Sequence, residues 1–150
     1  MSRSRAIAAW DRLHMPDVDP SAVWVIVGDL DRLPEWAPVE SAHWGGDLPQ
    51  PDDTFTMSAL IGYRSHDLEC VVADWEAGRG YRVDVGGLPF TDGAAFLECR
   101  VESVIEAGGL GTEVKLQYAA QVSPWLVGVV RWGAQRRLGA ALRKLRRRVA

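Results

Sequence analysis

The sequence predicts an α+β fold in which a seven-stranded antiparallel sheet wraps around a long C-terminal helix. Three observations predict it. Residues 20–39 form two short helical segments with a Trp-Ala-Pro exit, residues 40–122 alternate between apolar and polar side chains, and residues 123–150 repeat apolar side chains at helical spacing. Such a layout packs one helix against one sheet and leaves room for a cavity.

Local signals predict the first strand and the two short helices. Residues 5–15 alternate loosely between apolar and polar side chains, which is typical of a strand. Asp19 followed by Pro20 predicts a helix start, because aspartate can accept a free backbone N–H and proline suits the first helical position. Asp31 is predicted to cap the second helical turn, and Pro38 to end it.

Six further strands are indicated by apolar side chains at a period of two, opposite a polar face. They are predicted over residues 40–45, 53–61, 66–76, 79–86, 94–106 and 111–122. Glycine-containing turns separate several of them. The longest connection between strands, residues 86–93, carries one aromatic residue, Phe90, which we expect to overhang the cavity.

The final helix is predicted from Ser123 to about Val149, because a Ser-Pro pair is a helix start signal. Its apolar residues fall within one stripe of a 3.6-residue period: Val127, Val130, Ala134, Leu138, Ala141, Leu145 and Val149. We expect this stripe to pack against the curved face of the sheet.

Composition and charge indicate one domain over residues 1–150 and favour a cytoplasmic location. No apolar run approaches the ~20 residues that span a bilayer, and the basic N-terminus lacks the apolar segment of a secretory signal. The net charge of −3 is unevenly distributed. Residues 1–122 hold 9 Lys/Arg against 20 Asp/Glu, whereas residues 123–150 hold 8 basic residues and no acidic one. The acidic part would repel phosphate, which disfavours nucleic acid as a partner.

The sequence lacks the motifs of metal, phosphate and nucleophilic chemistry. His14, His43 and His66 fall on three separate predicted strands without ligand spacing. No glycine-rich segment matches a phosphate cradle, and no G-x-S-x-G motif is present. Cys70 and Cys99 fall on apolar faces away from any helix start, so we expect reduced thiols in the core. We therefore predict no catalytic residue, no metal and no cofactor.

Inward-facing positions of the predicted strands, together with the long loop, supply candidate ligand-binding residues. The set is Phe55, Met57, His66, Cys70, Tyr81, Phe90, Cys99 and Tyr118. Because apolar pockets with few polar groups suit hydrophobic ligands, we expect His66 and Tyr118 to orient the ligand. Plain core packing is the alternative for the aromatic residues. An enzymatic reading would need an acid–base pair, for which His66 with Asp74 or with Tyr118 is the candidate.

The outer side of the final helix predicts a second binding surface. Trp125 and Trp132 lie roughly opposite the apolar stripe and share their side with Arg136 and Arg143. Tryptophan beside arginine is typical of interfaces, so a protein partner, a second copy of the chain in a homodimer, or an anionic membrane surface would fit. Alternatively, a kink near Gly133 turns both rings inward and the arginines only solubilise the helix end.

A set of residues around the short helices carries a family resemblance: Pro20, Val23, Trp24, Asp29, Leu30, Leu33 and Trp36-Ala37-Pro38-Val39. With the strand order and the terminal helix, they resemble the START-like, or SRPBCC helix-grip, superfamily of polyketide cyclase/dehydrase and lipid-transport-like proteins. The resemblance implies a sheet that grips the long helix around a hydrophobic cavity. It also implies binding or transport of a small hydrophobic ligand of lipid, polyketide or aromatic type.

Two alternative functions follow from the same resemblance. Some members of the superfamily are enzymes, which implies a polyketide cyclase-like or dehydratase-like activity. A narrower similarity is to members described as toxin components of toxin–antitoxin pairs. They share the spacing of Asp29, Leu30 and Trp36, a Gly-rich loop before the penultimate strand and a basic terminal helix. This similarity implies an interaction protein that acts through its C-terminal helix.

Overall fold

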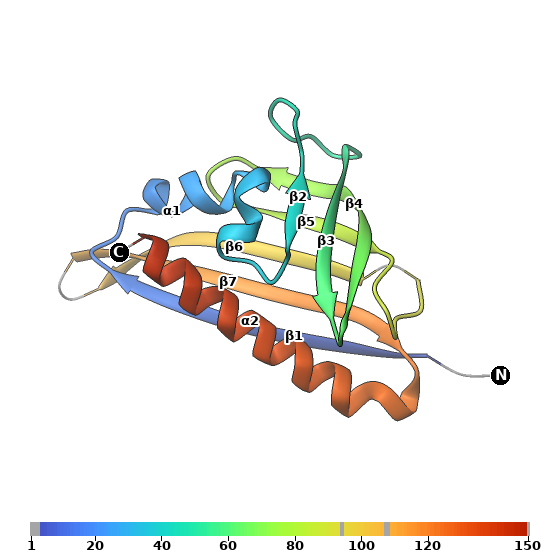
Figure 1. The fold of residues 1–150 in the computed structure, drawn as a ribbon. Coiled ribbons are helices and arrows are strands. Elements are labelled where there is room, and N and C mark those ends of the chain that lie inside the picture. Colours follow the sequence, from blue (N-terminus) through green and yellow to red (C-terminus); the bar gives the residue numbers. More distant parts are fainter. Residues whose placement is uncertain (1–3, 94, 107–108, 150) are drawn as a thin grey trace.

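The computed structural model describes residues 4–93, 95–106 and 109–149, and it contains one seven-stranded antiparallel sheet (Figure 1). The strands are β1 (Arg5–Pro16), β2 (Ser41–His43), β3 (Thr54–Ile61), β4 (Arg64–Glu76), β5 (Gly80–Gly86), β6 (Ala95–Glu106) and β7 (Gly109–Val122). Their spatial order is β1-β7-β6-β5-β4-β3-β2, so the first strand pairs with the last. The start of the predicted strand at residue 94 lies outside the described residues.

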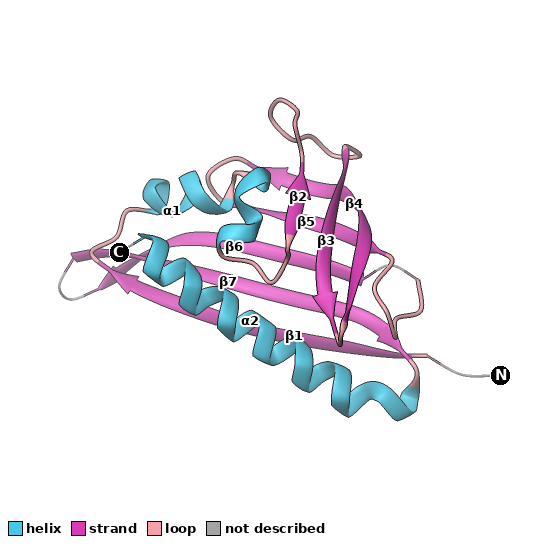
Figure 2. Cartoon of the chain, in the orientation of Figure 1, coloured by secondary structure: helices cyan, strands magenta, loops and turns pink. Residues whose placement is uncertain are grey.

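All helical segments lie on one face of the sheet (Figure 2). They are α1 (Pro20–Val27), the 3₁₀ helix η1 (Leu30–Glu35), the 3₁₀ turn η2 (Pro124–Leu126) and α2 (Val127–Val149). The predicted layout of two short helices and one long C-terminal helix is therefore confirmed. None of the helices in the described part of the chain is long and apolar enough to cross a membrane.

Side-chain caps fix the short helices, with one correction to the prediction. The Asp19 carboxylate accepts the Ser21 N–H at 2.9 Å, as expected of an N-cap. The second helical segment is capped by Asp29 rather than Asp31, because the chain turns two residues earlier and Asp29 Oδ1 accepts the Asp31 N–H at 3.1 Å. The Asp31 carboxylate instead accepts the Trp44 N–H at 2.9 Å, which ties η1 to the segment after β2.

An aromatic cluster holds α1 against the sheet. The rings of Trp75 and Tyr81 stack with centroids 4.9 Å apart, and Trp24 of α1 meets Trp75 edge-on at 5.4 Å. The buried Tyr81 hydroxyl donates to the Val27 carbonyl at 2.9 Å, at the last residue of α1. These contacts fix the position of α1, and hence of η1, over one end of the sheet.

The long helix packs tightly along only part of its length. In its C-terminal half, Leu138, Ala141, Leu142 and Leu145 are fully buried in the main core. Toward its start the stripe is only partly covered, and Val127 and Val130 contact a small separate cluster around Val122. The start of α2 therefore lies further from the sheet interior than its end, and the cavity lies beneath this region.

Candidate ligand cavity

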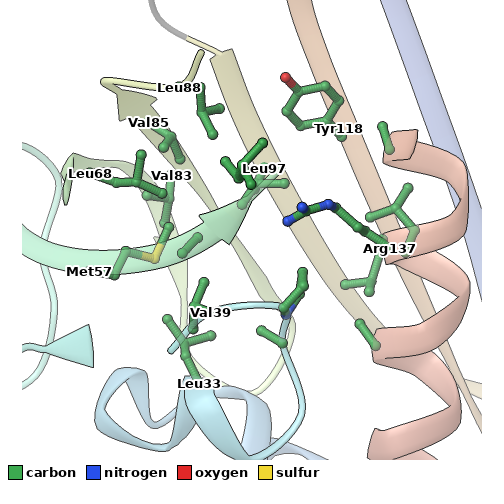
Figure 3. A pocket seen from close by; sticks show the side chains of 18 of the residues that line it. Leu33, Val39, Met57, Leu68, Val83, Val85, Leu88, Leu97, Tyr118 and Arg137 are labelled. Atoms are coloured by element: carbon green, nitrogen blue, oxygen red, sulfur yellow. The ribbon is translucent and has the colours of Figure 1, made fainter. Parts of the chain in front are cut away.

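A cavity of about 500 Å³ lies between α2, η1 and the inner face of the sheet (Figure 3). Side chains from β3, β4, β5, β6 and β7 form its wall, because alternate residues on each strand face α2. Six of the sequence-predicted residues line it: Phe55, Met57, Tyr81, Phe90, Cys99 and Tyr118. Their role as ligand contacts remains a prediction.

Two predicted ligand-binding residues, His66 and Cys70, are not among the residues that line the cavity. Both lie on the inward-alternating positions of β4, beside Leu68, which does line it. His66 is only half-buried because it lies two residues after the β3–β4 turn, near the end of the strand. Cys70 is fully buried in the main core, between Phe55 of β3 and Val85 of β5.

The candidate acid–base pair of His66 with Asp74 does not form. The two residues lie on the same strand, eight positions apart, and are therefore separated by roughly 26 Å. Instead, Oδ2 of Asp74 lies 3.5 Å from Nη2 of Arg100. Among the described residues that line the cavity there is no histidine, and the one carboxylate, Glu98, accepts a hydrogen bond from Arg100 at 3.0 Å.

Exposed apolar side chains surround the mouth of the cavity. Val129 and Trp132 of α2 and Phe90 of the β5–β6 loop both line the cavity and remain more than half exposed. Phe90 has a φ of 68°, a left-handed conformation that is unusual for a bulky residue and characteristic of functional sites. The Thr91 hydroxyl donates to the Leu88 carbonyl at 2.9 Å, which stabilises this loop.

A cationic residue that was not predicted from the sequence, Arg137, lies at the cavity. It is partly buried, and its side chain points from α2 into the cavity (Figure 3). Its Nη2 donates to the Leu60 carbonyl at 2.9 Å, so it reaches from α2 to β3. The helical period could have indicated this position. Arg137 follows Ala134 by three residues and precedes Ala141 by four, so it lies on the helix face next to the apolar stripe.

Two further polar groups accompany Arg137. Burial raises the pKa of the Tyr118 hydroxyl, and the charge of Arg137 opposes this rise, so the phenol lies within electrostatic reach of the guanidinium. Trp36 is buried at the end of η1, and its Nε1 has no hydrogen-bond partner among the described residues. A buried N–H without an acceptor is costly, which marks Trp36 as a residue that a ligand could satisfy.

Neither the two cysteine thiols nor any metal-binding cluster forms a reactive centre among the described residues. Burial raises the pKa of both Cys70 and Cys99 to about 12, so neither is a thiolate near neutral pH. Both cysteines are buried, and neither forms a disulfide bond. In the described ranges, no group of three or more His, Cys, Asp or Glu side chains is arranged to bind a metal.

The outer side of η2 and α2 carries the predicted partner-binding residues. Trp125 of η2 is 81% exposed and Trp132 of α2 is 62% exposed, so both rings reach solvent, although Trp132 also lines the cavity. Arg136 and Arg143 are exposed on the same helix, and the Arg136 guanidinium carbon lies 4.9 Å from the Trp132 ring centroid. Whether a partner binds this surface remains a prediction.

A seven-stranded antiparallel sheet around a long helix, with a cavity between them, defines a helix-grip protein of the START-like class. The family model described as polyketide cyclase / dehydrase and lipid transport matches residues 14–150. The chain therefore belongs to this family within the SRPBCC superfamily. A comparison with curated protein sequences gives no significant match.

Solved structures support the fold assignment. A START superfamily protein from Mycobacterium smegmatis superposes with a TM-score of 0.74 at 14% identity, covering 95% of this chain and 96% of that one. Ara h 8.0201 gives a TM-score of 0.66 at 14% identity, with coverage of 97% and 98%. Truncated norcoclaurine synthase from Thalictrum flavum gives 0.66 at 16% identity, with coverage of 97% and 96%. These identities are low, so the comparisons establish the fold alone.

Proposed function

We propose that the protein binds a small hydrophobic ligand in the cavity under α2. The observation that carries this proposal is a cavity of about 500 Å³ whose lining is almost wholly aliphatic and aromatic. This volume lies in the range of small-molecule sites, and an apolar lining with a few polar groups favours an apolar ligand of defined orientation. Membership of a family named for polyketide cyclases and lipid transport supports the same class of ligand.

Two glycines of α2 provide a matched test. A Cβ at either Gly133 or Gly128 would meet no atom within 4 Å, but only Gly133 lines the cavity. Both Gly133→Phe and Gly128→Phe should fold, because phenylalanine is a better helix former than glycine. Gly133→Phe should weaken binding of the neutral fluorescent probe N-phenyl-1-naphthylamine by about 10-fold, since overfilling a packed site costs 1–3 kcal/mol. Gly128→Phe should bind as the wild type does.

Equal affinities in the wild type and both variants would place the probe elsewhere and contradict the proposal. Native mass spectrometry of freshly purified protein gives an independent test. A co-purified hydrophobic molecule in the wild type that is depleted in Gly133→Phe supports the cavity as the binding site. A wild-type chain that neither carries a ligand nor binds the neutral probe contradicts it.

A second candidate function is docking on an anionic membrane through the outer side of η2 and α2. The exposed rings of Trp125 and Trp132 favour it, together with the 8 basic and no acidic residues of segment 123–150. Arginines attract anionic headgroups, and tryptophan side chains partition into the interface of the bilayer. Because Trp132 also lines the cavity, docking there would bring the cavity mouth close to the membrane.

Vesicle co-sedimentation tests this second function. The wild type should bind phosphatidylcholine vesicles that contain phosphatidylglycerol, and high salt should release it from them. It should not bind vesicles of phosphatidylcholine alone. The double variant Trp125→Ala/Trp132→Ala should lose most binding, whereas Trp10→Ala, an exposed tryptophan on β1, should retain it. If the chain instead formed a dimer that required Trp125 and Trp132 and did not bind vesicles, membrane docking would be contradicted and this surface would be a homodimer interface.

A further inference from the structure

The polar side chains that could contact a ligand in the cavity offer more hydrogen-bond donors than acceptors. Arg137 offers only donors, and so does the indole of Trp36, whereas the Tyr118 hydroxyl can donate or accept. The Tyr81 hydroxyl, which also lines the cavity, already donates to the Val27 carbonyl. Glu98 and Gln117 of the lining are paired in register across β6 and β7. They alternate with the inward-facing Leu97, Cys99, Leu116 and Tyr118, so their side chains belong to the opposite face of the sheet.

Arg137 differs from the other partly buried arginines in its surroundings. Arg32 lies 2.7 Å from the Glu35 carboxylate, and Arg100 contacts three carboxylates. For Arg137, no carboxylate of the described residues lies within 4.0 Å, and its one hydrogen bond goes to the Leu60 carbonyl. One neutral acceptor leaves four of its five N–H groups for other partners.

The four unused N–H groups of Arg137 are significant because of the charges around them. The segment before α2 is strongly acidic, with 20 Asp/Glu against 9 Lys/Arg over residues 1–122, yet none of these acids pairs with Arg137 in the described structure. A partly buried cation without a counter-charge is disfavoured, so a ligand that brings an anion would gain from both electrostatic attraction and hydrogen bonding.

We propose that the cavity binds an apolar ligand that ends in a carboxylate, and that the Arg137 guanidinium binds this carboxylate. This inference rests on the proposed function. A carboxylate matches the guanidinium because one planar anion of unit charge accepts two parallel N–H bonds from one arginine. A phosphate monoester, which carries more negative charge, would remain undercompensated beside a single cation. The Trp36 indole N–H and the Tyr118 hydroxyl are available for a further acceptor on the ligand, such as a carbonyl.

Decanoic acid and 1-decanol test the inference, because they share an alkyl chain and differ in the anionic end group. Both are measured at pH 8 by displacement of N-phenyl-1-naphthylamine from the full-length protein. The wild type should prefer the acid by about 10-fold, since a hydrogen bond to a charged group contributes about 1.5–3 kcal/mol. Arg137→Gln should abolish this preference by weakening the binding of decanoic acid more than that of 1-decanol.

Two further variants, a third ligand and a thermal melt complete the test. Arg137→Lys keeps the charge without the planar fork, so it should retain part of the preference for the acid. Arg131→Gln removes one exposed arginine from the same helix and should behave as the wild type does. Decyl phosphate should bind less tightly than decanoic acid. A thermal melt of each variant confirms that it is folded.

Distinct outcomes would overturn this inference or the proposed function. Equal binding of acid and alcohol to the wild type would overturn the role of Arg137 and leave the hydrophobic cavity in place. If Arg137→Gln weakened the binding of decanoic acid and 1-decanol equally, the hydrogen bond from Arg137 to Leu60, rather than anion binding, would account for the effect of Arg137 on affinity. Tighter binding of decyl phosphate would replace the carboxylate by a phosphate. Failure of every probe to bind the wild type would contradict the proposed function itself.

Discussion

Tyr81 and Tyr118 line the same cavity but differ in what their hydroxyls do. The Tyr81 hydroxyl is buried and donates to the Val27 carbonyl, and burial raises its pKa well above the ordinary value. The Tyr118 hydroxyl has no protein partner among the described residues, although burial raises its pKa too. Tyr81 therefore belongs to the structural anchor of α1, and Tyr118 is the tyrosine that a ligand can use.

Replacing Tyr81 by Phe should reduce the free energy of unfolding by about 1–3 kcal/mol, because the Val27 carbonyl loses its buried donor. Urea unfolding measures the change. Tyr63→Phe is the matched control, since Tyr63 is fully exposed in the β3–β4 turn and should shift stability by less than about 0.5 kcal/mol. Equal stability of both variants would show that the Tyr81 hydroxyl has no role in the anchor.

Sequence reasoning at this scale succeeded where alternation alone decides the outcome. Phe55 and Met57 face inward because every second residue of β3 does, and they line the cavity. Cys70 also faces inward on β4 but meets the packed core instead of the cavity. Where an inward side chain meets empty space depends on how α2 crosses the sheet, and no local pattern specifies that. Arg137 was missed for the same reason, since its position beside the stripe becomes meaningful only once the cavity is located.

At the scale of elements, α1 depends on a close approach at its C-terminal end. Gly28 caps this helix, and a Cβ there would lie 2.5 Å from Cε2 of the Trp24 ring. The same ring packs edge-on against Trp75. The glycine therefore leaves room for the ring that anchors α1 to the sheet, while its own backbone φ of −81° is unremarkable.

Gly28→Ala should therefore destabilise the protein by about 1–3 kcal/mol, because the Trp24 ring must move out of its packed position. Gly128→Ala in α2 is the control, since a Cβ there meets nothing within 4 Å and alanine is the better helix former. Denaturant midpoints of the two variants should shift in opposite directions. A Gly28→Ala variant as stable as the wild type would indicate that Trp24 has an alternative packed position.

Elements were more predictable than the contacts between them. Asp19-Pro20 and the alternating strands act over a few residues, so their positions follow from sequence. The cap of η1 was misassigned by two residues, because Asp29 and Asp31 are both acceptable caps and tertiary structure decides between them. Only Asp29 is left for the cap once Asp31 accepts the N–H of Trp44, a residue 13 positions away.

At the scale of the whole molecule, a basic C-terminal helix packs on an otherwise acidic chain. One contact between the two charge regions lies at the end of α2, where Arg148 reaches to within 3.8 Å of Glu35 in η1. Glu35 also pairs with Arg32 at 2.7 Å in its own helix. The Arg32 hydrogen bond lowers the pKa of Glu35, and the charges of Arg32 and Arg148 lower it further.

The direction of this shift fixes a pH dependence. Because the pKa of Glu35 is lower in the folded chain than in the unfolded chain, its ion pairs stabilise the fold above the ordinary carboxylate pKa. The stabilisation disappears as the pH falls through the pKa that Glu35 has in the folded protein. The side chains of Glu35, Arg32 and Arg148 are between about a third and a half exposed, so the effect should be small and screened by salt.

Glu35→Gln should therefore unfold at a slightly lower urea concentration than the wild type at pH 7, and the difference should vanish in acid. Glu69→Gln removes an exposed carboxylate of β4 that forms no ion pair in the described structure, so it should track the wild type at both pH values. Adding salt at pH 7 should also narrow the Glu35 difference, because the charges are near the surface. A deficit of Glu35→Gln that persists unchanged in acid would mean that packing of this side chain, rather than its charge, joins η1 to the end of α2.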